Sequence, residues 1–284
     1  MYWPEGALEM ITSASNGRVK WVVSLMEKAR MRRKERKYVV EGIRMFMEAP
    51  PELIAEVYIS ESFSRKAGVK GSQEEACLRH LEERKKAIPE DFVTKVSDDV
   101  FRKFADTVNP QGILAVMDMA EVSPDKMLET KKPLLVLLEN LQDPGNLGTI
   151  LRTAEGAGVN GIVLSRDCVD LYNPKVIRST MGAIYRVPFL YTEDLTATMR
   201  ELQNRSIPVY AAALDEKAGV YDSYDYNEAA AFLIGNEGNG LTQEAIAAAT
   251  HICYIPMEGQ AESLNASVAA SILMYEAYRQ RRTK

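Results

Sequence analysis

The sequence predicts an α/β protein of two domains, the second built on a mostly parallel sheet with helices on both faces. Three observations support this prediction. The chain has 284 residues, which is longer than most chains that fold around a single hydrophobic core. Its second half alternates short apolar runs with helical patterns, which is typical of strand–helix–strand units. One of those runs, Leu134–Leu138, is continuously apolar, as expected of a strand covered on both faces.

The first half of the chain alternates helices and strands on a smaller scale. A helix with an apolar face is expected after Asn16, followed by a strand at Tyr38–Val40 and a further helix. More strands are predicted at 54–60, 91–96 and 113–118, and more helices at 74–86 and 98–104. This half is therefore predicted to be a small α/β domain, residues 1–120. The polar, irregular stretch 121–132 is predicted to be a linker.

Residues 133–284 form the second predicted domain. After Leu134–Leu138, the turn residues Asp143-Pro-Gly-Asn146 lead into a helix at 147–157, for which Asn146 is the expected N-cap. The later elements are predicted as strands at 161–164, 208–213, 230–234 and 252–255, and as helices at 174–181, after Leu241 and at 265–282. This order predicts a doubly wound sheet.

Composition excludes several classes of protein. The hydrophobic content of 46% and the charged content of 26% are ordinary for a globular protein. No apolar run is long enough to span a membrane, and the N-terminus does not resemble a signal peptide, so a cytoplasmic location is expected. The cysteines and histidines are scattered and form no metal-binding pattern, so neither a metal site nor a disulfide framework is predicted: Cys77, Cys168, Cys253, His80 and His251.

The net charge is −5, but residues 16–44 are strongly basic. The densest part contains five candidate RNA-binding residues: Arg30, Arg32, Arg33, Lys34 and Arg36. Such a cluster is either a solvated helix face or an electrostatic surface for phosphates.

Three loops that follow predicted strands carry the polar residues of a candidate site. The first is 143–146, the second is 235–241, and the third is 255–265. Open α/β sheets bind ligands where such loops meet at the carboxyl ends of the strands. None of the loops has the phosphate-binding pattern Gly-x-x-x-x-Gly-Lys-Ser/Thr, and the second does not follow the first strand of its domain. A nicotinamide-binding domain is therefore disfavoured.

Together the three loops resemble the signature motifs of the SPOUT class of methyltransferases, in its SpoU branch of RNA ribose 2′-O-methyltransferases. The first match runs from Asn140 through Asp-Pro-Gly-Asn-Leu-Gly to Arg152-Thr-Ala, the second is Gly235-Asn-Glu-Gly-Asn-Gly240, and the third includes Ile255-Pro-Met and Ser263-Leu-Asn-Ala-Ser. Asn173-Pro-Lys and Ser179-Thr-Met-Gly-Ala183 fit the family as well. The first half is similar to the ribosomal-protein-like substrate-binding domain of many such enzymes.

The resemblance implies a Rossmann-like parallel sheet with a deep trefoil knot and a bound S-adenosylmethionine. It implies cofactor-binding roles for Gly235, Ile255 and Leu264. The remaining polar motif positions are the candidate catalytic residues: Arg152, Asn146, Glu237, Ser263 and Asn265. The family's motif arginine, which Arg152 matches, has been proposed as a general base. A guanidinium is almost always protonated, so we instead expect Arg152 to bind the target phosphate and stabilise charge on the 2′-oxygen. Glu237, or a water that it orients, is our candidate for accepting the proton.

Several alternatives remain open at this point. The resemblance implies an RNA substrate, and the appended domain favours ribosomal RNA over tRNA. A catalytically silent RNA-binding assembly factor and a nucleotide-dependent oxidoreductase are the competing functions.

The family's members are dimers, and the C-terminal helix supplies a plausible interface. Its stripe of Leu264, Val268, Ile272 and Tyr275 is expected to pack on its own sheet, and the line of Ala269, Leu273 and Ala277 is expected to meet a second subunit.

Overall fold

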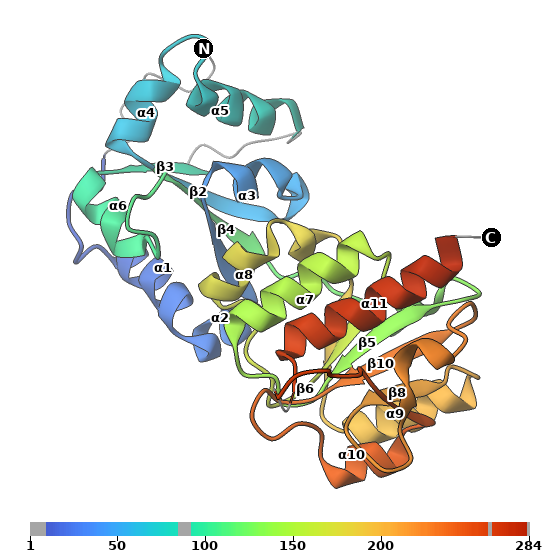
Figure 1. Ribbon diagram of the computed structural model, residues 1–284. Coiled ribbons are helices and arrows are strands. Elements are labelled where there is room, and N and C mark those ends of the chain that lie inside the picture. The colour runs from blue at the N-terminus through green and yellow to red at the C-terminus, as the bar shows by residue number, and fades with distance from the viewer. Residues whose placement is uncertain (1–9, 85–91, 261–262, 283–284) are drawn as a thin grey trace. The chain divides into compact units, whose positions relative to one another are not determined.

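The computed structural model describes residues 10–84, 92–260 and 263–282 and divides into two compact units (Figure 1). The first unit contains Met1–Ala120 together with Tyr172–Tyr185, and the second contains Glu121–Leu171 and Arg186–Lys284. The segment 172–185 therefore packs with the first unit, although its place in the sequence lies within the predicted second domain. Within the described ranges, no helix is both long and apolar enough to cross a bilayer.

The first unit has a mixed sheet in the order β1-β4-β2-β3, in which only β2 and β3 are parallel neighbours. Its strands are β1 Lys37–Glu41, β2 Ile54–Ser60, β3 Val93–Val96 and β4 Ile113–Asp118. Its helices are α1 Gly17–Glu27, α2 Ala29–Glu35, α3 Ile43–Glu48, α4 Glu61–Ala67, α5 Gln73–Arg84, α6 Asp98–Phe104 and α8 Pro174–Thr180, with short 3-10 turns η1 Pro51–Leu53 and η3 Ala183–Tyr185. These bounds confirm the predicted α/β alternation. The predicted helix end at Lys85-Lys86 and the strand start at Asp91 lie outside the described residues.

Helix α1 shows how the sequence builds this unit. The Asn16 side chain caps the helix by accepting a hydrogen bond from the Arg18 N–H. Val19, Val22 and Leu25 then recur at helical spacing and are fully buried. They join a core that also contains aromatic residues of β2 and α6: Tyr58, Phe101 and Phe104. Burial of this apolar face fixes α1 against α6.

The second unit has an entirely parallel sheet in the order β7-β6-β5-β10-β8-β11-β9. Its strands are β5 Leu134–Leu138, β6 Gly161–Ser165, β7 Phe189–Thr192, β8 Val209–Ala212, β9 Gly219–Val220, β10 Ala230–Ile234 and β11 His251–Tyr254. Its helices are α7 Pro144–Gly156, α9 Leu195–Asn204, α10 Gln243–Ala248 and α11 Ala266–Arg282, with short 3-10 turns η2 Pro124–Leu128 and η4 Tyr221–Ser223. The strands β7 and β9 and the helix α9 were not predicted.

Helices cover both faces of this sheet, which confirms the doubly wound arrangement. Figure 1 shows α7 and α11 side by side on one face, and α9 and α10 on the other. The chain leaves β5 toward α7 and leaves β10 toward α10, so the two central strands send their helices to opposite faces. Such a reversal between neighbouring strands opens a crevice at their carboxyl ends, where α/β proteins bind ligands.

Two details of the second unit differ from the prediction. Helix α7 begins at Pro144, and Asp143 rather than Asn146 is its N-cap, with the Asp143 carboxylate accepting from the Asn146 N–H at 2.7 Å. Proline is favoured at the first helical position because its missing N–H would have no partner there. The predicted linker is also part of this unit, because Met127 in η2 is buried in the core against Gly161.

Candidate active site

The loops that follow β5 and β10 are tied together along their length. In the structure the first of the three loops comprises residues 139–143, because α7 already begins at Pro144, and the second comprises residues 235–242, which end at the N-cap of α10. The buried Glu139 carboxylate accepts hydrogen bonds from Thr242, from its N–H at 2.8 Å and from its hydroxyl at 2.7 Å. The Asn236 amide donates to the Asn140 carbonyl at 2.8 Å. These contacts close the second loop against the carboxyl end of β5.

Glu237 joins the second loop to the start of α7. Its carboxylate accepts from the backbone N–H groups of Gln142 at 3.1 Å and Asp143 at 2.9 Å. It also accepts from the Asn146 side-chain amide at 3.0 Å. The carboxylate therefore binds main-chain donors of the first loop and one side chain of α7, and this fixes the orientation of the Asn146 amide.

Asn146 in turn contacts the third loop, residues 255–265. Residues 261 and 262 of this loop are not among the residues that the structure describes. Its buried side-chain oxygen accepts from the Asn265 amide at 3.0 Å. The Asn265 oxygen then accepts from the N–H of Ser267 at 2.9 Å and from its hydroxyl at 2.7 Å, at the start of α11. Glu237, Asn146 and Asn265, predicted from three separate stretches of sequence, thus form one hydrogen-bonded series.

The surroundings of Glu237 affect its basicity. Burial raises the pKa of the carboxyl group, but the hydrogen bonds from Asn146, Asp143 and Gln142 lower it more, so the net pKa lies below the ordinary value. A carboxylate with a lowered pKa holds a proton weakly. The geometry therefore argues that Glu237 positions Asn146, and argues against the role of general base expected from the sequence.

Arg152 and Ser263 lie outside this series. Arg152 is exposed on α7, and its side chain makes no hydrogen bond or ion pair with the part of the chain that the structure describes. Ser263 is exposed ahead of α11 and likewise has no hydrogen-bond partner among the described residues. Arg152 is thus a cation free to meet an anionic ligand, whereas nothing in the geometry assigns Ser263 a task.

Two of the three candidate cofactor positions have main-chain polar groups available for a ligand. Ile255 and Leu264 are half-buried loop residues, and their N–H and C=O groups make no hydrogen bond within the described ranges. Such groups can bind the polar edge of an adenine while the side chains pack on its ring, so these two residues fit the expected S-adenosylmethionine.

Gly235 has a different structural reason to be glycine. A Cβ atom there would lie 2.4 Å from the Gly240 carbonyl carbon and 2.5 Å from the Leu241 nitrogen. These atoms belong to the second loop itself, which folds back through paired hydrogen bonds between Asn236 and Gly240. Gly235 is therefore required for loop closure, a role that the sequence did not indicate.

One of the five candidate RNA-binding residues in the basic segment, residues 16–44, does not face solvent. Arg32 is 2% exposed, and its guanidinium donates to the carbonyls of Leu25 at 2.7 Å and Met26 at 3.0 Å. It caps the end of α1, so its assignment to RNA binding is wrong. Arg30, Arg33, Lys34 and Arg36 are exposed, as that assignment requires.

Sequence reasoning missed the residues that hold the second loop. Glu139 and Asn140 follow the buried β5 run directly, and polar residues at the carboxyl end of such a strand are a signal of a site. Thr242 precedes α10 as its N-cap. Their mutual contacts, across about a hundred residues of sequence, could not be read from either stretch alone.

Comparison with known proteins gives matches over both units. Residues 133–275 match the model of the SpoU rRNA Methylase family, and residues 16–115 match that of the MRM3-like substrate binding domain. The chain is 32% identical over 275 residues to the 23S rRNA (guanosine(2553)-2′-O)-methyltransferase RlmP of Bacillus subtilis, covering 94% of this chain and 98% of that protein. It is 37% identical over 176 residues to the 23S rRNA (guanosine-2′-O-)-methyltransferase RlmB of Bordetella pertussis, covering 60% and 71%.

A solved structure is also similar over almost the whole chain. The AdoMet-bound rRNA methyltransferase from Sinorhizobium meliloti superimposes with a TM-score of 0.79 at 27% identity, covering 95% of this chain and 97% of that one.

Proposed function

Since this chain belongs to the SpoU rRNA methylase family, we propose that it transfers a methyl group from S-adenosylmethionine to a ribose 2′-hydroxyl of ribosomal RNA. The observation that carries the proposal is the series Glu237–Asn146–Asn265, which joins the three loops at the carboxyl end of the sheet. These are the positions that the resemblance assigned to the reaction, and they come from all three motifs.

The residues of this chain supply binding, orientation and charge. When bound, S-adenosylmethionine supplies an activated methyl group. Ile255 and Leu264 would hold its adenine through main-chain groups, and the closed second loop that begins at Gly235 would form one wall of the site. The exposed Arg152 guanidinium would bind the target phosphate and stabilise negative charge on the 2′-oxygen as its proton passes to water. Positioning of this kind lowers the barrier of a bimolecular displacement by removing its entropic cost.

Ribosomal RNA is favoured over tRNA because of the first unit. Residues 16–115 match a substrate-binding domain, and RlmP, which is similar over almost its whole length, is named for 23S rRNA. A tRNA substrate and a catalytically silent assembly factor are the alternatives. The cytoplasmic location and the trefoil knot stay predictions.

A homodimer through α11 belongs to the same proposal, with a corrected interface. Leu273 and Ala277, expected to meet a second subunit, are fully buried within their own unit. Val268 and Tyr275, expected to be buried, are 45% and 49% exposed, and the half-buried Ile272 lies between them at helical spacing. This apolar stripe, Val268, Ile272 and Tyr275, is where we place a self-complementary contact.

The direct test is transfer of tritium from labelled S-adenosylmethionine to total RNA, followed by mapping of 2′-O-methyl sites in a deletion strain. We expect incorporation into ribosomal RNA and the loss of one ribose methylation in the deletion strain. Incorporation only into tRNA would support the alternative substrate, and no incorporation into any RNA would support the silent assembly factor.

A further inference from the structure

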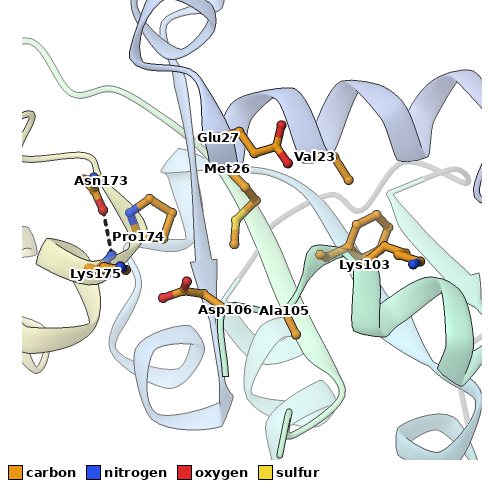
Figure 2. A pocket seen from close by; sticks show the side chains of 10 residues that line it. Val23, Met26, Glu27, Lys103, Ala105, Asp106, Asn173, Pro174 and Lys175 are labelled. Atoms are coloured by element: carbon orange, nitrogen blue, oxygen red, sulfur yellow. Dashed lines mark hydrogen bonds between the residues drawn. The ribbon is translucent and has the colours of Figure 1, made fainter. Parts of the chain in front are cut away.

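A cavity of about 310 Å³ lies within the first unit, between α1, α6 and the residues that open α8 (Figure 2). It shares no residue with the Glu237–Asn146–Asn265 series. Its size is at the lower end of ligand pockets, which enclose roughly 300–1,000 Å³. The cavity is therefore suited to one small group, such as a single nucleobase.

The lining combines an apolar floor with charged groups. Val23 and Met26 of α1 are half-buried, and Figure 2 shows the Met26 side chain reaching toward the middle of the cavity. Pro174 lines the opposite side. Apolar contacts on two sides suit an unstacked base, because its faces are poorly solvated when it leaves its neighbours.

One lining carboxylate is free and one is anchored. Asp106 is held by Arg178 at 2.7 Å, within the same unit. Glu27, the last residue of α1, has neither a hydrogen bond nor an ion pair among the described residues. The Glu27 carboxylate is thus available as a two-oxygen acceptor at the cavity. Guanine offers two adjacent donors, its N1–H and its N2 amino group, and so matches a carboxylate better than uracil, which has only one N–H.

Cations flank the cavity from two directions. Lys103 of α6 and Lys175 of α8 both line it, are exposed, and have side chains without a partner in the described part of the chain. Figure 2 places them on opposite sides of Met26. Exposed Lys28, Arg30 and Arg33 follow Glu27 directly along the chain. A single RNA strand crossing the cavity would find a cation on either side for its phosphates.

We propose that this cavity receives one unpaired guanine of the RNA, with Glu27 accepting from its donor edge and Lys103 and Lys175 binding the flanking phosphates. The inference rests on the proposed function because it takes RNA as the ligand. It adds a base-selective contact away from the candidate methyl-transfer residues.

The test compares binding of two fluorescent RNA pentamers, UUGUU and UUUUU, to the full chain by anisotropy. We expect the wild type to prefer UUGUU by about tenfold, the size of a good carboxylate-to-base contact. Glu27→Gln should remove this preference, and its affinity for UUUUU should not fall, because the change removes a negative charge beside the bound phosphates. Glu52→Gln, an exposed carboxylate elsewhere in the unit, is the matched control and should keep the preference.

Further outcomes separate the sources of binding. Lys103→Ala with Lys175→Ala should weaken both pentamers. If GMP competes as well as UUGUU and the lysine changes have no effect, the site binds a free nucleotide and the proposal is overturned. An absent preference, or one that survives Glu27→Gln, overturns it as well. Methyl transfer to total RNA, measured on the same variants, is independent of these outcomes: a wild type that transfers methyl groups without base preference refutes only the cavity.

Discussion

Glu237 and Asn146, which lie 91 residues apart in the sequence, are joined by a hydrogen bond of 3.0 Å. The bond turns the Asn146 amide so that its oxygen faces the Asn265 amide, 3.0 Å away. One carboxylate in the second loop thereby sets the direction of a polar series that ends at the start of α11. The ionised state of Glu237 is what all three of its donors recognise.

The first prediction concerns pH and the variant Glu237→Gln. Because the folded-state pKa of Glu237 lies below its ordinary value of 4.5, the ionised carboxylate stabilises the fold above that pH. This stability is lost as the pH falls through the folded-state pKa. The wild type should therefore have a higher Tm than Glu237→Gln at pH 7, and the difference should shrink below about pH 4.5. Calorimetric scans across this range measure it, and a difference independent of pH would show that the charge of Glu237 does not matter.

The second prediction separates chemistry from cofactor binding at Arg152. Arg152→Ala should reduce methyl transfer by about a hundredfold or more, in line with loss of a group that stabilises developing charge. S-adenosylmethionine affinity and Tm should stay near wild type, because the side chain is exposed and makes no hydrogen bond or ion pair in the described part of the chain. Calorimetric titration of the cofactor and a single-turnover assay test this. Comparable losses of both quantities would place Arg152 at the cofactor instead.

The third prediction follows from the crowding at Gly235. Gly235→Ala places a Cβ atom 2.4 Å from the Gly240 backbone, so the second loop cannot close as observed. Thermal stability and cofactor affinity should both fall. Gly238→Ala is the matched control in the same loop, since its Cβ would meet nothing nearer than 3.6 Å, and it should be tolerated. Equal behaviour of the two variants in thermal-shift and titration experiments would refute the role of loop closure.

Much of the fold could be predicted because the apolar runs and the residues that bound them indicate the same ends for several elements. The runs at β5 and β10 and the helix α6 were predicted with their observed bounds. Helix α9 was missed, although Leu195, Met199 and Leu202 recur at helical spacing on its buried face. The periodic signal for α9 is therefore present in the sequence.

Other features depend on contacts that sequence order does not reveal. Tyr172 packs against Tyr38 with ring centroids 4.6 Å apart, and Arg178 pairs with Asp106, so the segment 172–185 joins the first unit. On α11, two apolar stripes lie one residue apart in the sequence, and helical periodicity alone cannot tell which one meets the sheet. The structure buries the stripe that contains Leu273.

The fourth prediction distinguishes the exposed basic residues of the segment 16–44, which should bind RNA, from the buried Arg32, which should stabilise the fold. Replacing Arg30, Arg33 and Lys34 by Ala should weaken RNA binding and reduce the slope of log affinity against log salt by roughly 2, at ~0.7 per phosphate contact on a single strand. The fold should be unaffected, because all three are exposed. Arg32→Ala should instead lower the unfolding free energy by about 2 kcal/mol, since it leaves two carbonyls at the end of α1 without their charged donor. A salt slope that stays unchanged in the triple variant would mean that the segment is only a solvated surface.

The last prediction concerns the dimer and uses Val268→Glu. Val268 is the third residue of α11, where a glutamate suits the helix and its dipole, so this variant should not loosen the helix itself. It would, however, place a charge within a self-complementary apolar contact, and we expect a monomer in sedimentation velocity. Because α11 begins next to Asn265, which binds Asn146, methyl transfer should fall together with dimerisation.

Val108→Glu is the matched control for this experiment, because Val108 is 96% exposed in the first unit, and it should stay dimeric and active. Leu273→Glu would be uninformative about assembly, since Leu273 is fully buried and its replacement should unfold the second unit. A Val268→Glu protein that remains a dimer would move the interface away from the Val268, Ile272 and Tyr275 stripe. A fully active monomer would show that assembly does not hold the third loop in place.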